Sequence, residues 1–327
     1  MKKRFFKVFK VLTITSTLLL TIFILSIAII TTNMNYQLPE IINVELYDST
    51  NHKYLSYSNG KKQSYVKLDD ISPYLKEAFI SIEDKRFYKH HGVDIIRMGG
   101  AVLKNLKSNK LSEGASTITQ QYVRNLYLTT EKTWKRKINE ILISLNIEKN
   151  YSKSEILEGY LNSIYFDHGI YGVEDASIYY FNKHAKDLTL TEAAAIASIP
   201  KGPTLYSPIK NPENNKERRN LILKEMVNDG LITNEEYEES SKTTLTCVGN
   251  NPNDDVVNAP YFQDLVLQEL KKIPEISGKM AGGLKVYTTL NTELYTAIND
   301  SIKKRAPESD IETAIYAMEP STGKVLA

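Results

Sequence analysis

The stretch SIEDKRFYKHHG, Ser81–Gly92, places two adjacent acids beside aromatic residues, two histidines and a glycine. The preceding run YLKEAFISIED is typical of a helix. On one face of that helix fall four residues: Ile80, Glu83, Phe87 and His90. Glu83 therefore interrupts an apolar stripe, where a carboxylate is partly desolvated and suited to act as a general base. Acids near helix ends are also common in structural roles, so both interpretations stay open.

A second acid, Glu140, lies in the run TWKRKINEILISLNIEKN, which has the periodicity of a helix with apolar residues on both sides. The pattern predicts a core face made of Trp134, Ile138, Ile141, Leu142 and Leu145. On the opposite side Glu140 lies four positions after Arg136, with Ile143 and Ile147 in line. Glu140 is either half of an i, i+4 ion pair or a second chemical group.

Four cations lie near the second acid, and between the two acids runs the polar segment GASTITQQ, Gly114–Gln121. The cations are Arg124, Lys132, Arg136 and Lys137. Clustered cations indicate an anionic substrate group such as phosphate, or else a solvated basic face. The Ser and Thr residues of GASTITQQ predict a helix start, and Gln120 and Gln121 can hydrogen-bond a sugar or an amide.

The chain of 327 residues has room for roughly two domains, and its net charge of +2 conceals a basic first ten residues. From Val11 to Thr32 an apolar and hydroxyl stretch of about 22 residues is long enough to cross a bilayer. We expect a transmembrane helix rather than a cleaved signal peptide, with the basic tail in the cytoplasm. The single cysteine, Cys247, excludes an internal disulfide.

Patterning along the chain predicts five parts: a basic tail (1–10), the span (11–32), a stalk with a strand-like run IINVELYD (33–60), a mainly helical domain (61–243), and a small α/β C-terminal segment (244–327). Capping boxes predict helix starts at Ser152, Thr189 and Thr233. The last segment contains a helix candidate, FQDLVLQELKKI, and a strand candidate, LKVYTTL.

Five ordered motifs resemble the family 51 peptidoglycan glycosyltransferases, which occur alone or as the first catalytic domain of class A penicillin-binding proteins. In chain order the motifs are Glu83, Asp84, Phe87, His90 and Gly92; Gly114–Gln121; Arg136, Lys137 and Glu140; ILEGYLNSIYF with YGVEDA; and AAAIASIPKGPTLYSP. One departure is FDHG, where Asp167 stands at a position that is usually glycine in the family. That departure leaves the local loop conformation open.

The resemblance implies a lysozyme-like α-helical fold, lipid II as substrate, and location in a bacterial plasma membrane. It implies that Glu83 is the base that deprotonates the acceptor sugar hydroxyl, that Glu140 organises the donor, and that the reaction inverts the anomeric centre. The further implied substrate-binding residues are Arg124, Lys132, Arg136, Lys137, Ser116, Thr117, Gln120, Gln121, Asp84, Phe87 and His90. A divalent ion such as Mg²⁺ is a plausible assistant at the donor pyrophosphate. The expected partners are the growing glycan chain, membrane lipid and other cell-wall synthesis and division proteins, without nucleic acid.

Two further segments carry expectations. The run DIIRMGGAVLKNLKSNK, 94–110, alternates apolar and basic residues, which is typical of an interfacial helix and also of a core helix with a solvated side. The tail AIYAMEPSTGKVLA resembles the opening strands of a penicillin-binding transpeptidase domain. Its S-x-x-K matches lack S-D-N and K-T-G companions, so we expect no transpeptidase activity and a chain truncated at the start of that domain.

Three other functions compete with this one. A lytic transglycosylase or lysozyme-like hydrolase uses a glutamate to cut glycan, but cleavage of a neutral bond needs no pyrophosphate site. A membrane-anchored scaffold that binds glycan without catalysis does not explain Glu83 and Glu140. Metal hydrolysis by His90 and His91 is disfavoured because adjacent histidines point apart on a helix and no H-E-x-x-H is present.

Overall fold

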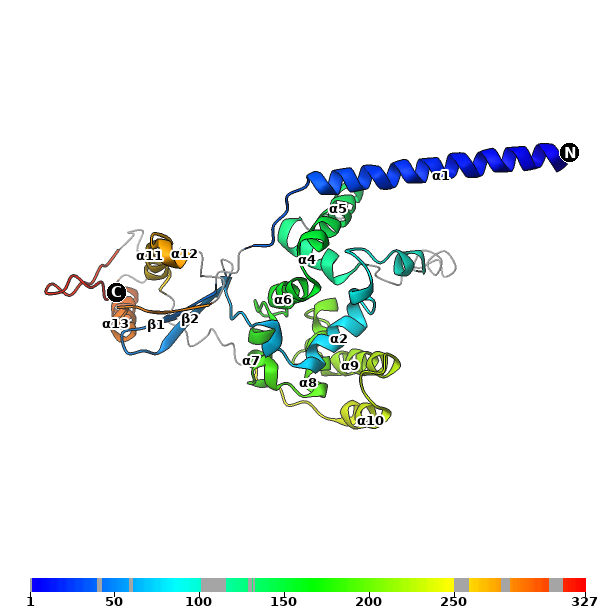
Figure 1. Ribbon diagram of the computed structural model, residues 1–327. Coiled ribbons are helices and arrows are strands. Elements are labelled where there is room, and N and C mark those ends of the chain that lie inside the picture. The colour runs from blue at the N-terminus through cyan, green and yellow to red at the C-terminus, as the bar shows by residue number, and fades with distance from the viewer. Residues whose placement is uncertain are drawn as a thin grey trace. The chain divides into compact units, whose positions relative to one another are not determined.

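The structure is a computed structural model that describes residues 2–39, 43–58, 61–100, 116–128, 131, 133–249, 259–277, 283–305 and 314–327. The chain forms two compact units. Unit 1 comprises Met1–Leu38 and Glu77–Ile164, and unit 2 comprises Pro39–Lys76 and Tyr165–Ala327. Helices dominate the described residues, which confirms the predicted mainly α class (Figure 1).

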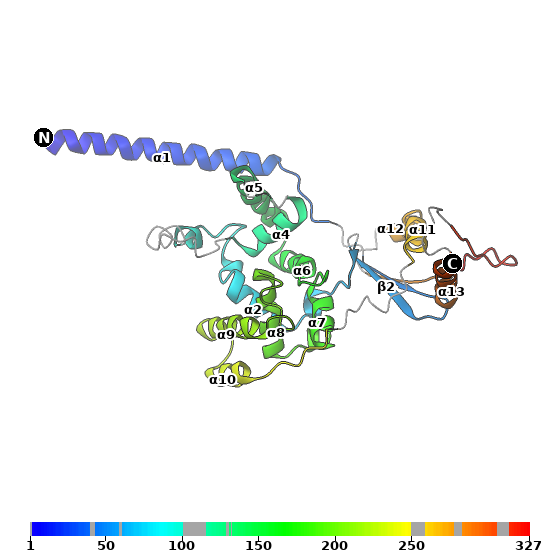
Figure 2. The same cartoon turned by 180° about the vertical axis from the view of Figure 1, so that it is seen from behind.

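Unit 1 is built around α4, which packs against both α5 and α6. Its helices are α1 (Lys2–Asn33), the second half of α2 (Pro73–Glu83), α4 (Ile118–Tyr127), α5 (Trp134–Asn150) and α6 (Lys153–Ser163), with a short 3₁₀ helix η2 (Phe87–Lys89). The C-terminal end of α1 lies beside α5 in both views (Figures 1 and 2). Asn146 on α5 fixes this contact because its Nδ2 donates to the carbonyls of Thr31 and Met34, each at 2.9 Å.

Helix starts follow the capping chemistry of the sequence. The predicted boxes form at Ser152 with Glu155, at Thr189 with Glu192, and at Thr233 with Glu236. A fourth box begins α4: the Thr117 hydroxyl accepts from the Gln120 N–H, and the Gln120 side chain accepts from the Thr117 N–H at 2.9 Å. The polar segment before α4 is therefore a helix start, as predicted.

The predicted core face of α5 is wrong. Trp134 is 87% exposed and Ile138 is 55% exposed, whereas Glu140, Ile143 and Ile147 on the opposite side are buried. A helix that is apolar on both sides does not indicate by periodicity alone which side packs inward. Burial of Glu140 is possible here because two neighbouring cations neutralise it.

The predicted membrane span, residues 11–32, lies within α1, a single helix of 32 residues. Its described side chains include exposed Val11, Leu18, Ile22 and Leu25. Among the residues that the structure describes, no helix combines the length and apolar character needed to cross a membrane, so this prediction is not confirmed.

Unit 2 contains a helical part and a small sheet. The helical part consists of η1 (Leu68–Asp70), α7 (Val173–Phe181), η3 (Ala185–Asp187), α8 (Leu190–Ser198), η4 (Ile199–Lys201), α9 (Pro212–Asn228) and α10 (Asn234–Lys242). The sheet has the order β3-β2-β1-β4. Its elements and covering helices are β1 (Asn43–Tyr47), β2 (Lys53–Ser58), β3 (Lys61–Lys62), β4 (Leu284–Tyr287), α11 (Pro260–Lys271), α12 (Pro274–Ser277) and α13 (Thr292–Arg305).

The sheet joins two segments that the sequence pattern treats separately. β1 pairs antiparallel with β2 and parallel with β4, so the predicted stalk and the C-terminal segment share one sheet. The strand candidates IINVELYD and LKVYTTL and the helix candidate FQDLVLQELKKI all form. Their apolar faces bury one common core: Val44, Leu46, Tyr54, Leu55, Ala259, Phe262, Leu270 and Leu290.

The segment FDHG adopts a backbone that glycine normally provides. Asp167 has φ +70° and His168 has φ +52°, both in the left-handed region that aspartate tolerates better than most residues. The Asp167 carboxylate is anchored by Lys210 Nζ at 3.0 Å and faces the Thr204 hydroxyl at 3.4 Å. These contacts stabilise the turn without a glycine at position 167.

Candidate active site

Glu83 is the last residue of α2, and the chain turns directly after it. Phe87 and His90 lie beyond that turn, in and after η2, so the predicted single helical face with Glu83 is wrong. The helix ends because the next residue, Asp84, is held by groups from elsewhere in unit 1. Glu83 is thereby placed at a helix terminus rather than on a helix side.

Asp84 is fully buried and organises the turn. Its carboxylate faces His90 Nε2 at 2.9 Å and accepts the backbone N–H of Ile118, the first residue of α4, at 2.9 Å. Thr117 adds a second tie, since its hydroxyl donates to the Gly92 carbonyl at 2.7 Å. The first two sequence motifs are therefore bonded to each other through Asp84 and Thr117.

Gly92 is required where it stands. It has φ +83°, and a Cβ there would lie 2.7 Å from the carbonyl oxygen of Ser144 on α5. Any other residue at this position would have a strained backbone, and its Cβ would clash with the Ser144 carbonyl. The glycine of the first motif thus allows the turn to approach α5.

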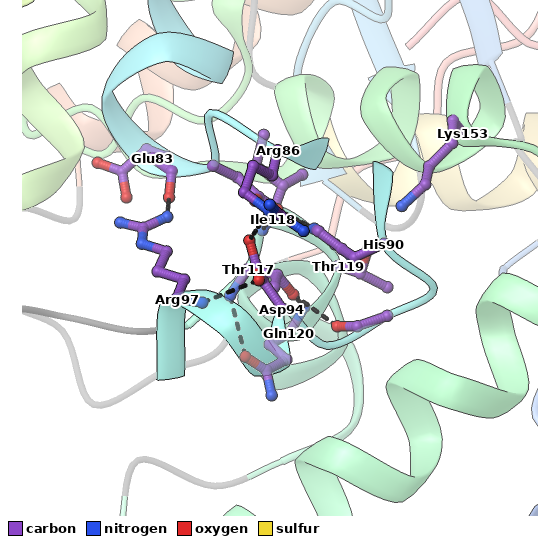
Figure 3. Close-up of polar contacts among 12 residues, drawn as sticks. Glu83, Arg86, His90, Asp94, Arg97, Thr117, Ile118, Thr119, Gln120 and Lys153 are labelled. Carbon is purple, nitrogen blue, oxygen red and sulfur yellow. Dashed lines mark hydrogen bonds and ion pairs between the residues drawn. The ribbon is translucent and has the colours of Figure 1, made fainter. Parts of the chain in front are cut away.

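Glu83 itself is half-buried. Gln121 Nε2 donates to Glu83 Oε2 at 2.8 Å. Arg97, in the helical residues 95–100, directs its guanidinium at the backbone and donates through Nη1 to the Glu83 carbonyl (Figure 3). The carboxylate thus receives a neutral amide donor while a nearby cation holds its backbone.

Glu140 has a different environment. It is 1% exposed, and both its oxygens face cations from its own helix: Arg136 Nη1 at 2.7 Å and Lys137 Nζ in a short contact. The i, i+4 pair expected from the sequence forms, but in a buried position. Lys137 Nζ also donates to the Ser116 hydroxyl at 2.8 Å. Both oxygens of the Glu140 carboxylate are therefore engaged by cations.

The segment Ser116–Gln121 contacts the surroundings of both acids. Its first residue, Ser116, binds the lysine that pairs with Glu140, and its last, Gln121, binds Glu83. Both contacts come from one short stretch of chain, which lies beside α5 because α4 packs against that helix. One short segment therefore contacts both groups of selected residues: Glu83 through Gln121, and Lys137, with its partner Glu140 and Arg136, through Ser116.

The remaining selected residues are placed as follows. Thr117, Gln120, Phe87 and Asp84 are fully buried, and His90 is 6% exposed. Their contacts are with the protein, and their role as substrate ligands stays a prediction. Arg124 is half-buried on α4, while Lys132 and residues 101–115, including most of the interfacial run and Gly114, lie outside the described residues. Within the described chain, Gln120 Nε2 and Arg136 Nε are buried donors without a hydrogen-bond partner.

Metal chemistry finds little support in the donor set. Among the described residues, no group of three or more His, Cys, Asp and Glu side chains lies close enough together to hold an ion. Glu140, the acid beside the cations, already has both oxygens engaged. The described residues therefore offer no ready set of ligands for a protein-held Mg²⁺, and the expected ion stays a prediction.

Comparison with known proteins assigns the sequence to a family. The sequence model of the family described as transglycosylase matches residues 50–227, more than half of the chain. The chain belongs to the transglycosylase family. The match includes both acids and the segment between them, in agreement with the resemblance drawn from the five motifs.

Several curated relatives of this chain are penicillin-binding proteins. Penicillin-binding protein 2D of Bacillus subtilis (strain 168) is 45% identical over 285 residues, covering 86% of this chain and 41% of the relative. Penicillin-binding protein 1F of the same organism is 40% identical over 271 residues, covering 80% and 37%. Penicillin-binding protein 1A of Aquifex aeolicus (strain VF5) is 39% identical over 261 residues, covering 80% and 35%. The chain spans less than half the length of these relatives.

Three residues at the candidate site were not selected from the sequence: Asp94, Arg97 and Tyr160. Asp94 is 1% exposed and accepts Arg86 Nε at 3.0 Å and the Arg97 N–H at 2.9 Å. Burial alone would raise the pKa of Asp94, but the Arg97 N–H and the Arg86 charge lower it. Tyr160 lies inside the fourth motif, in the run EGYLN, and its place in that motif could have identified it as a candidate. For Arg97 the sequence carries no distinguishing pattern.

Proposed function

We propose that this chain is a peptidoglycan glycosyltransferase that polymerises lipid II into glycan strands and releases polyprenyl pyrophosphate. The observation that carries the proposal is that the segment Ser116–Gln121 contacts Glu83 directly and contacts Lys137, the partner of Glu140. The two acids have different environments. One acid is half-buried beside a neutral amide, and the other is neutralised by cations. Transfer of a sugar from a pyrophosphate donor needs one base and one anion-binding group, and the site supplies both.

Glu83 is assigned as the base. Glu83 is a half-buried carboxylate that accepts a hydrogen bond from the Gln121 amide, and a carboxylate can accept from more than one donor. The acceptor sugar hydroxyl is that donor, and Glu83 removes its proton as the oxygen attacks the anomeric carbon. Attack from the side opposite the pyrophosphate inverts the configuration, so no covalent glycosyl-enzyme is required.

The cations of α5 are assigned to the departing pyrophosphate. Arg136 and Lys137 are held by Glu140, so their positive groups are fixed before the substrate binds. Arg136 Nε has no hydrogen-bond partner within the described residues and offers a donor to a phosphate oxygen. Arg124 and Lys132 are assigned to the same anion from the sequence pattern alone. Glu140 organises these cations and does not act as a base.

We further propose that α1 attaches the chain to the bacterial plasma membrane, where a polyprenyl substrate resides. The support is the number of exposed apolar side chains on α1, among them Phe9, Leu12, Leu19 and Ile29. Extraction of membranes with carbonate and then with detergent tests this attachment. Recovery of the full chain in the aqueous fraction without carbonate would contradict it.

The polymerisation proposal is tested by incubating the purified full chain with lipid II in detergent and resolving the products on a gel. Polymer of increasing length is the expected result. A second incubation with preformed glycan strands separates the rival function, because a lytic enzyme would shorten them. Fragments from glycan without polymer from lipid II would replace this proposal with a hydrolytic or lytic one.

A further inference from the structure

A buried tyrosine lies behind the amide that contacts Glu83. The Tyr160 hydroxyl donates to Gln121 Oε1 at 3.2 Å, and Gln121 Nε2 donates to Glu83 Oε2 at 2.8 Å. We propose that Tyr160 is a positioning residue for the reaction: it fixes the Gln121 amide in the orientation that presents a donor to the base. This inference rests on the proposed function of Glu83.

The orientation of the Gln121 amide decides whether a hydrogen-bond donor or an acceptor faces the Glu83 carboxylate. An amide has a donor end and an acceptor end of nearly the same shape, so a half-turn exchanges them. With the donor end toward Glu83, the ionised carboxylate is stabilised. With the acceptor end toward Glu83, the oxygen lone pairs repel the ionised carboxylate and favour its protonated form. Tyr160 selects the first orientation because its hydroxyl donates to the amide oxygen.

Tyr160 is suited to act as a permanent donor. It is fully buried, and burial together with the negative charge of Glu83 raises its pKa well above 10. The hydroxyl therefore keeps its proton at any pH at which the protein would work. Arg124 opposes this increase only in part.

Packing holds the tyrosine ring in place. The ring meets Phe79 edge-on, with ring centroids 6.1 Å apart and an interplanar angle of 90°. Phe79 lies one helical turn before Glu83 on α2, so Tyr160 contacts that helix directly and also through Gln121. Its neighbour Gly159 lets α6 approach α4, since a Cβ there would lie 2.1 Å from the Tyr122 hydroxyl oxygen.

Several charged groups surround this chain of hydrogen bonds. Asp84 follows Glu83 directly, Arg97 holds the Glu83 carbonyl, and Arg124 acts on Tyr160 from α4. None of these groups is altered when the tyrosine hydroxyl alone is removed. A change in pH dependence after that removal therefore reports the amide and not a new charge.

The test is Tyr160→Phe in the full chain, assayed with lipid II from pH 5 to pH 9. We expect kcat to fall about 5- to 20-fold, KM to change less than 2-fold, and the acidic limb of the kcat/KM profile to move at least half a pH unit higher. The shift follows because loss of a donor to the ionised form favours the protonated base. Tyr122→Phe, which removes a hydroxyl from a buried tyrosine on α4, is the matched control and should leave the profile unchanged.

A second variant distinguishes positioning from general damage. In Gln121→Ala the acidic limb should already be shifted, and adding Tyr160→Phe should shift it no further. Loss of rate in Tyr160→Phe without a shift, or a further shift in the Gln121→Ala background, would overturn the inference. A titration of the Glu83 carboxyl by NMR in wild-type protein and Tyr160→Phe gives the same comparison without turnover, so it separates this inference from a failure of the proposed function.

Discussion

The dipeptide Glu-Asp occurs twice in regions with contrasting roles: Glu83-Asp84 at the end of α2 in unit 1, and Glu174-Asp175 in the first turn of α7 in unit 2. In the first pair Asp84 is buried and bonded while Glu83 is half-buried beside Gln121. In the second pair both acids are buried. Glu174 accepts the Ala185 N–H at 2.9 Å and faces His184 Nδ1 at 2.6 Å, and Asp175 accepts the Ser64 N–H at 3.1 Å.

The difference lies in what surrounds each acid and not in the dipeptide. A helix C-terminus leaves a glutamate at the edge of its element, where a ligand can reach it. The first turn of a helix favours negative charge, and both acids of the second pair accept backbone N–H groups from other segments, Ala185 and Ser64. The same two letters therefore supply a candidate base in one region and structural anchors in the other.

The largest expected effect separates the two glutamates. Glu83→Gln should lower the rate of lipid II polymerisation by about 10²- to 10⁴-fold, because the amide keeps the shape and loses the basicity. Binding of lipid II and the unfolding midpoint should change little. Glu174→Gln, the same change in the other pair, should retain most of the turnover per folded molecule. Comparable losses of turnover in the two variants would show that Glu83 has no special chemical role.

The second prediction concerns Asp84. Asp84→Ala should lower the free energy of unfolding by about 3 to 5 kcal/mol, because it leaves His90 and the Ile118 N–H buried without their partner. Asp84→Asn keeps an acceptor and should cost clearly less. Denaturant unfolding measures both. If the alanine variant unfolds at the wild-type midpoint, the tie between the first two motifs is not what stabilises the turn.

Much of this organisation could be predicted from sequence because it depends on local chemistry. The capping boxes at Ser152, Thr189 and Thr233 are set by residues three positions apart, and they form as predicted. The cluster around Glu140 also follows local i, i+4 spacing. The motifs selected Gln121 and Lys137, but they did not predict which groups these two side chains contact.

What could not be predicted depends on residues distant in the chain. The end of α2 at Glu83 follows from a bond between Asp84 and Ile118, 34 residues away. The inward side of α5 depends on which helices pack against it, and a helix that is apolar on both sides gives no local signal. The pairing of β1 with β4 joins segments more than 200 residues apart, beyond the reach of any periodicity.

The third prediction uses the burial of Asp175. Burial raises its pKa to about 6, while the Ser64 hydrogen bonds oppose the increase. A carboxyl with a raised folded-state pKa binds a proton more readily when folded, so stability falls as pH rises from about 4 to 6 and stays lower above that range. Asp175→Asn should therefore stabilise the protein at pH 7.5 by about 1 to 3 kcal/mol and flatten the dependence between pH 4 and 6. Denaturant unfolding at several pH values checks this, and an unchanged slope with lower stability at pH 7.5 would contradict it.

The smallest expected effect belongs to His184, the partner of Glu174. The hydrogen bond and negative charge of Glu174 raise the pKa of His184 above 6.5, although the histidine side chain is 73% exposed. A histidine whose folded pKa is raised stabilises the protein below the unfolded pKa, and this contribution is lost as pH rises through the folded value. Because the ring is exposed, we expect His184→Gln to cost only about 0.2 to 1 kcal/mol at pH 5.5 and close to nothing at pH 8.5. The comparison is made as a difference from wild type at each pH, since Asp175 titrates over part of the same range in both proteins. Equal costs at the two pH values would mean that the ring acts by packing and that Glu174 stabilises α7 through the Ala185 N–H instead.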